Sequence, residues 1–113
     1  MFEFRESAIE GGIIVLALSG RLDALTALEL RPTIDRLVEQ KKSKVVVDMA
    51  NLTNIDSSGV GALVSLFKRS RMLGGDVKIA NLQGKPLQIF QLLRLDRAFD
   101  IFDTVEQAAA RFR

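Results

Sequence analysis

The sequence contains no cysteine, histidine, tyrosine or tryptophan, and these absences exclude several kinds of chemistry. Without cysteine there are no disulfides, thiol nucleophiles or cysteine-ligated metals. Without histidine, the usual zinc sites and the Ser-His and Cys-His catalytic arrangements are excluded as well. The residue types that remain favour a protein that acts by binding, and we expect no enzymatic activity, metal or cofactor.

An excess of one charge and a long apolar run are also missing. Sixteen basic and fourteen acidic residues give a net charge of +2. Because no basic stripe with interleaved aromatic residues is present either, we expect no nucleic-acid partner. No apolar run approaches the ~18 residues of a membrane span, and residues 1–6 do not resemble a signal peptide. We therefore expect a cytoplasmic protein without membrane insertion.

What the sequence does contain is enough apolar material for one core. Its 113 residues are 48 % hydrophobic, which predicts a single domain over residues 1–113. Period-two alternation over 2–6 and an apolar run over 13–19 predict two antiparallel strands. A helix is expected from residue 24 to about residue 40, with a bend or restart near Arg31 because Pro32 interrupts it.

The rest of the chain alternates strands and helices. The apolar periodicity predicts strands at 44–49, 76–80 and 98–102, and helices at 60–73, 85–95 and 104–112. Strands separated by helices pair in parallel with right-handed crossovers. We therefore predict an α/β fold with a mixed, mainly parallel sheet of four to five strands and about four helices.

The stretch at 54–61 (Asn-Ile-Asp-Ser-Ser-Gly-Val-Gly) joins a buried strand to a helix and is the most informative part of the chain. Asp56 here, and Asp23 and Asp48, are placed at or near the ends of predicted strands, so Asp23 and Asp56 are expected to border one surface. An enzyme would use them as an acid/base pair or a magnesium site. The alternative, which we favour, is that Asp23 and Asp56 cap helices.

The two serines and two glycines of this stretch leave fewer possibilities. A hydrolase elbow needs Gly-x-Ser-x-Gly and a histidine, and a Walker motif needs a lysine, so neither motif is present. Ser57 or Ser58 is then a helix cap or a residue phosphorylated by another protein. Gly59 and Gly61 either let the helix pack closely on the sheet or let the backbone of a partner approach.

Three segments together resemble a known family. Residues 20–23 (Gly-Arg-Leu-Asp), 45–49 (Val-Val-Val-Asp-Met) and 55–61 (Ile-Asp-Ser-Ser-Gly-Val-Gly) are similar to the STAS domain, and more narrowly to bacterial anti-sigma factor antagonists. The resemblance implies that the unphosphorylated protein binds an anti-sigma factor that is also a serine kinase, and so releases a sigma factor. It further implies that a metal-dependent serine phosphatase reverses the phosphorylation.

The resemblance also assigns roles to residues. It implies that Ser57 is the phosphoacceptor, with Ser58 as the alternative, and that Asp23 lies beside it and contributes to partner binding. With Asp56, Ser58, Gly59 and Gly61, Asp23 would belong to a docking surface along the helix at 58–73. A second possibility is a STAS subunit or scaffold of a transport or signalling complex. The oligomeric state is left open by the sequence.

Overall fold

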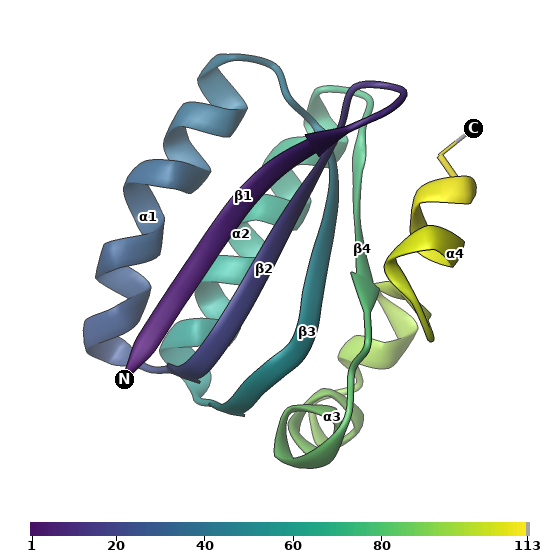
Figure 1. Ribbon diagram of the computed structural model, residues 1–113. Helices are drawn as coiled ribbons and strands as arrows, with labels where there is room; N and C mark the ends of the chain where they lie inside the picture. Colours follow the sequence, from purple (N-terminus) through teal and green to yellow (C-terminus); the bar gives the residue numbers. More distant parts are fainter. Residues whose placement is uncertain (113) are drawn as a thin grey trace.

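The computed structural model describes residues 1–112 and contains a five-stranded sheet with four α-helices (Figure 1). The strands are β1 (Phe2–Ile9), β2 (Ile13–Leu22), β3 (Lys44–Ile55), β4 (Asp76–Ala80) and β5 (Asp100–Phe102). The helices are α1 (Ala24–Glu39), α2 (Ser57–Met72), α3 (Gly84–Leu92) and α4 (Val105–Ala110), with a short 3-10 segment at Leu95–Arg97. The predicted order of elements and the α/β class are confirmed.

The sheet has the strand order β1-β2-β3-β4-β5. β1 and β2 form the expected antiparallel hairpin, and every later pair is parallel. Because right-handed crossovers that advance in one direction place their helices on one face, α1, α2 and α3 all pack on the same side. This arrangement brings the starts of α1 and α2 to the same edge of the sheet (Figure 1).

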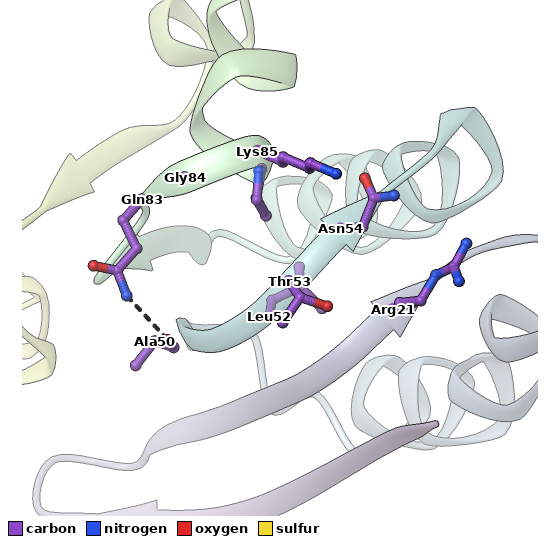
Figure 2. Close-up of a pocket in the computed structure, with 9 residues that line it drawn as sticks. Arg21, Ala50, Leu52, Thr53, Asn54, Gln83, Gly84 and Lys85 are labelled. Atoms are coloured by element: carbon purple, nitrogen blue, oxygen red, sulfur yellow. Dashed lines mark hydrogen bonds between the residues drawn. The ribbon is translucent and has the colours of Figure 1, made fainter.

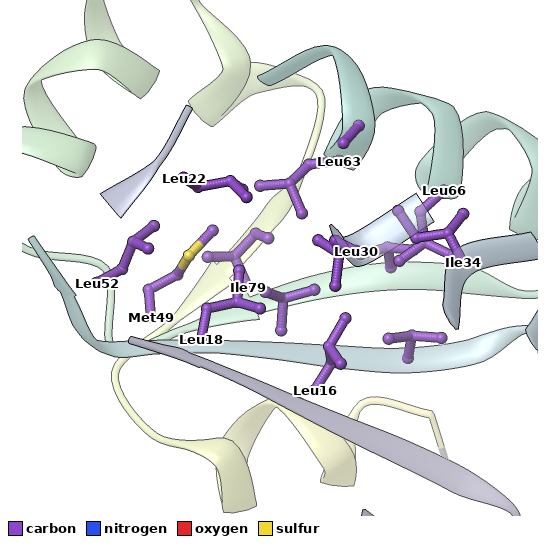
Figure 3. Packing of buried hydrophobic residues seen from close by; sticks show 14 of the residues in the cluster. Leu16, Leu18, Leu22, Leu30, Ile34, Met49, Leu52, Leu63, Leu66 and Ile79 are labelled. Atoms are coloured by element: carbon purple, nitrogen blue, oxygen red, sulfur yellow. The ribbon is translucent and has the colours of Figure 1, made fainter. Parts of the chain in front are cut away.

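The main core lies between the sheet and helices α1 to α3. Leu16 and Leu18 of β2 pack there with Leu30 and Ile34 of α1, and with Leu66 of α2 (Figure 3). All of these side chains are buried because the apolar stripes of the helices face the apolar strands. This core fixes the positions of α1 and α2 relative to each other.

The opposite face of the sheet is covered in part by α4. Ala108 and Ala109 of α4 pack on Ile13, Val15 and Val46 in a smaller core.

On the face of the sheet that α4 covers, Lys78 of β4 is buried and pairs with Asp76 at 3.0 Å and with Asp100 at 3.1 Å. Its ammonium also lies 4.8 Å from the centre of the Phe112 ring. These contacts compensate for the burial of the Lys78 charge.

Two predicted boundaries in the first half of the chain are wrong. α1 is one helix with Pro32 inside it, with no break at Arg31, because the buried residues Leu30, Ile34 and Leu37 hold both halves on the sheet. β3 continues past Met49 to Ile55 and pairs with β2 along this extension.

Because β3 continues, Asp48 lies within that strand and not at its end. It is the last residue of β3 that pairs with β4. Its carboxylate accepts hydrogen bonds from the Asn81 amide at 2.9 Å and from the backbone N–H of Ala50 at 3.1 Å.

The later boundaries differ by a few residues. α3 ends at Leu92 instead of residue 95, because Arg94 adopts a left-handed conformation (φ 58°) and starts the 3-10 segment. The last strand begins at Asp100, and α4 spans Val105–Ala110 within the predicted 104–112. The hydroxyl oxygen of Thr104 accepts a hydrogen bond from the Gln107 N–H at 3.1 Å and so caps the start of α4.

Candidate functional site

Asp56 is the N-cap of α2, as the sequence predicts. Its carboxylate accepts hydrogen bonds from the backbone N–H groups of Ser58 at 2.9 Å and Gly59 at 3.1 Å. These are two of the four N–H groups that a helix start leaves without helical partners. Ser57 is therefore the first residue of α2, and its side chain and that of Ser58 are both exposed.

Asp23 caps α1 through a reciprocal arrangement. Its carboxylate accepts from the N–H groups of Leu25 and Thr26, each at 3.1 Å, and the Asp23 N–H donates to the Thr26 hydroxyl oxygen at 2.8 Å. The sequence predicts the cap but not its partner, because threonine replaces the usual Glu or Gln of a capping box.

These contacts also set the charge of Asp23. Hydrogen bonds from the backbone and side chain of Thr26 lower the pKa of Asp23 below its ordinary value of 3.8. Partial desolvation opposes them, and the Leu25 N–H and the nearby Arg21 charge lower the pKa further. Asp23 is therefore a carboxylate at neutral pH and places a negative charge on the surface around the start of α1.

The two caps lie at one place because two parallel strands end together. Leu22 pairs with Ile55, and the Asp56 N–H donates to the Leu22 carbonyl at 3.1 Å. A small pocket of about 60 Å³ lies between the two turns and is lined by Arg21, Leu22, Asp23, Asn54, Ile55 and Asp56. The expectation that Asp23 and Asp56 border one surface is thus confirmed.

The two glycines of the motif have different environments. Gly59 is buried, and a Cβ there would stand 2.6 Å from the Leu22 carbonyl oxygen, so this residue allows α2 to pack on the end of β2. Gly61 is exposed, with open space around the position of a Cβ. The close-packing role applies to Gly59, whereas the approach of a partner remains a proposal for Gly61.

Next to Gly61, a groove of about 180 Å³ runs between α1 and α2. It is lined by Arg31, Ile34, Asp35, Gly61, Ala62, Ser65 and Arg69. Asp35 and Arg69 form an ion pair at 2.8 Å across it.

A larger polar pocket lies on the other side of Asn54. It has a volume of about 800 Å³ and opens where β3 diverges from β4, beside the start of α3 (Figure 2). Arg21, Asn54 and Lys85 line it, together with Thr53 and Gln83, and the Gln83 amide donates to the Ala50 carbonyl at 3.1 Å. This pocket could not be predicted from the sequence, because its residues come from three separate segments.

Over residues 1–112, no group of three or more acidic side chains is placed to hold a metal ion. The helices in that part of the chain are too short or too polar to cross a membrane. The site itself presents two exposed serines directly after the capping carboxylate of Asp56, on the surface that Asp56 shares with Asp23.

The comparison with protein families decides what kind of domain this is. The family description "STAS domain" matches residues 5–108, which is most of the chain. The chain belongs to the STAS domain family. It is 25 % identical over 93 residues to the anti-sigma F factor antagonist of Paenibacillus polymyxa, covering 81 % of this chain and 80 % of that protein.

Solved structures of STAS proteins share the fold. An anti-sigma factor antagonist from Mycobacterium paratuberculosis has a TM-score of 0.88 at 20 % identity, with 98 % of this chain and 93 % of that chain covered. The phosphorylated form of the Bacillus cell fate determinant SpoIIAA has a TM-score of 0.78 at 23 % identity, with coverage of 98 % and 100 %. The predicted family and fold are thereby confirmed.

Proposed function

We propose that this chain is a non-enzymatic anti-sigma factor antagonist that is switched by phosphorylation of Ser57. In its unphosphorylated form it binds an anti-sigma factor that is also a serine kinase, which releases the sigma factor. The kinase phosphorylates Ser57 and ends the interaction, and a metal-dependent serine phosphatase restores the binding form. The observation that carries the proposal is the exposed Ser57, which is the first residue of α2 and directly follows Asp56, on a surface that Asp56 shares with Asp23.

The geometry explains why a phosphate on Ser57 would act on a partner and not on the fold. A phosphoserine carries about −1.5 to −2 charges at neutral pH. The N–H groups of Ser58 and Gly59 already bind the Asp56 carboxylate, so the phosphate cannot take them without displacing the cap. Negative charges at Asp23 and Asp56 also disfavour an inward position. The phosphate is therefore presented to whatever covers this surface.

Ser57 is preferred to Ser58 by the resemblance, although the hydroxyls of both are exposed. Site mapping by mass spectrometry tests the assignment. The protein is incubated with ATP and each purified anti-sigma factor kinase of the source organism, and Ser57→Ala and Ser58→Ala are treated in parallel. We expect one phosphate on the wild type and on Ser58→Ala, and none on Ser57→Ala. Phosphate on Ser58 would reverse the assignment of the two serines.

Calorimetric titration against the same kinase tests the switch itself. Ser57→Ala should bind as the wild type does, whereas Ser57→Asp should bind about a hundredfold more weakly, which corresponds to about 3 kcal/mol. Circular dichroism confirms that both variants are folded. Equal affinities for the two variants would contradict a phospho-switch at this position.

A further inference from the structure

Two leucines at the start of α1 are exposed although the helix has already buried a full apolar stripe. Leu25 is 77 % exposed and Leu28 is 61 % exposed, whereas Ala27, Leu30, Ile34 and Leu37 face the core. Leu25 and Leu28 are three positions apart, so their side chains are neighbours on the same side of the helix. The fold does not use this second apolar stripe.

These leucines lie at the end of the molecule that carries Ser57. Leu25 follows the Asp23 cap by two residues, and α1 and α2 begin at the same edge of the sheet (Figure 1). Leu28 lies about 6 Å along α1 from its start, given a rise of 1.5 Å per residue. Helices that pack together are about 8–10 Å apart. The turn of α1 that carries both leucines therefore lies about 8–10 Å from α2.

An interface of ordinary size around Ser57 would also extend over the start of α1. A stable protein–protein interface buries about 800 Å² on each partner, which is a disc of about 16 Å radius. A disc of this size centred near Ser57 covers the starts of both helices. A partner that makes an interface of this size around Ser57 would then also contact Leu25 and Leu28.

The charge beside the leucines indicates the chemistry of the partner. Arg31 lines the groove between α1 and α2 and forms no salt bridge with any of residues 1–112, whereas Asp35 on the same helix is neutralised by Arg69. A segment that fits this surface has apolar side chains for the leucines and an acidic side chain for Arg31.

We propose that Leu25 and Leu28 are apolar anchors for the anti-sigma factor kinase, which docks an amphipathic, acidic segment across α1 as well as α2. This inference rests on the proposed function and deepens it, because it places part of the binding energy outside the phosphorylated turn. Side chains that become fully desolvated near the centre of an interface contribute more to affinity than contacts at its rim.

Calorimetric titration of the purified kinase against three forms of the full chain tests the proposal. The forms are the wild type, the double variant Leu25→Ala/Leu28→Ala, and a matched control, Met72→Ala/Leu92→Ala. The control residues are 85 % and 76 % exposed and lie in the last turns of α2 and α3. We expect the Kd to rise at least tenfold for the double variant and to change less than twofold for the control.

Thermal melting shows whether a loss of binding comes from a loss of folding. The double variant should melt no lower than the wild type, because alanine is a better helix former than leucine and both side chains are exposed. Arg31→Glu should also weaken binding, and more at low salt than at high salt. An unchanged Kd for the double variant would overturn the anchors and leave the proposed function intact. Failure of the wild type to bind any anti-sigma factor would overturn both.

Light scattering tests the alternative that a second copy of the chain occupies this surface. We expect the same monomer mass for the wild type and for Leu25→Ala/Leu28→Ala. A wild-type dimer that the double substitution dissociates, without any loss of affinity for the kinase, would overturn the proposal.

Discussion

The backbone carbonyl of Leu22 accepts a hydrogen bond from the Asp56 N–H at 3.1 Å and lies 2.6 Å from the position that a Cβ on Gly59 would occupy. One oxygen atom at the end of β2 thus fixes both the cap and the first turn of α2. This contact holds Asp56 and Asp23 at one small pocket even though they are 33 positions apart in the sequence. It is also a contact that substitution can test.

Gly59→Ala should destabilise the protein by about 1–2 kcal/mol, because overpacking against a backbone atom outweighs the gain in helix propensity. Gly61→Ala is the matched control, since it lies in the same helix with open space around it, and it should stabilise by up to about 1 kcal/mol. Urea unfolding measures both. A stabilising Gly59→Ala would show that α2 does not pack on Leu22 as described.

Pro32→Ala should stabilise the protein by about 1–3 kcal/mol, because proline inside a helix removes one hydrogen bond and crowds the carbonyl four residues earlier. Alanine supplies the missing N–H to the Leu28 carbonyl, and Pro32 is exposed, so little packing is lost. Glu29→Ala, also on the exposed side of α1, is the control and should change stability by less than about 0.5 kcal/mol. A loss of stability in Pro32→Ala would mean that the fold requires proline at this position.

The parts of this structure that could be predicted from the sequence are those decided by near neighbours. Asp23 and Asp56 are recognisable as caps because each precedes a helix, and the strands of the core are recognisable as apolar runs. The end of β3 was missed because Asn51, Thr53 and Asn54 look like a loop, whereas Leu52 and Ile55 hold that segment on the core. Tertiary packing overrode the local signal there, as it did at Pro32.

The surfaces of the site were harder to predict, because residues distant in sequence form them. Gly59 and Gly61 are only two positions apart, but Gly59 packs on the Leu22 carbonyl at the end of β2 and Gly61 has open space around it. The difference between them arises from the position of β2, which the local sequence does not reveal. The exposure of Leu25 and Leu28 could not be predicted either, because in the sequence they read as part of the apolar pattern of α1. The pocket shared by Arg21, Asn54 and Lys85 exists only because β3 leaves β4 after Asp48.

The lowered pKa of Asp23 predicts a loss of stability in acid. Because the native pKa lies below the ordinary value of 3.8, this carboxylate stabilises the fold above about that pH, and the contribution is lost as the pH falls through the native pKa. Asp23→Asn keeps a good cap without titrating, so its melting temperature should fall less steeply between about pH 5 and pH 2.

Asp76 contributes to the same pH window and serves as the comparison. Burial raises the pKa of Asp76, but hydrogen bonds from Lys78 and Arg71 outweigh it and lower the pKa overall. Asp23→Asn should therefore remove only part of the acid dependence, and Asp23→Asn/Asp76→Asn should remove more. If Asp23→Asn melts with the same pH dependence as the wild type, its carboxylate does not stabilise the helix in the way described.

The contact between Asp56 and its two N–H donors predicts a coupling with the charge state of Ser57. In the wild type, Asp56→Asn should change stability by less than about 0.5 kcal/mol, because Asn and Asp are comparable N-caps. In a Ser57→Glu background, the Asp56 carboxylate lies next to a second negative charge, so Asp56→Asn should stabilise by a few tenths of a kcal/mol up to about 1 kcal/mol. A double-mutant cycle from urea unfolding of the four proteins isolates this term.

The corresponding cycle with Ser58→Glu is the comparison, because the Ser58 N–H itself donates to the Asp56 carboxylate. A difference between the two coupling energies reports which serine lies nearer to that carboxylate. A coupling of zero at both serines would show that the cap does not sense a charge on this turn, and the repulsion that keeps the Ser57 phosphate pointing outward would then have no energetic basis.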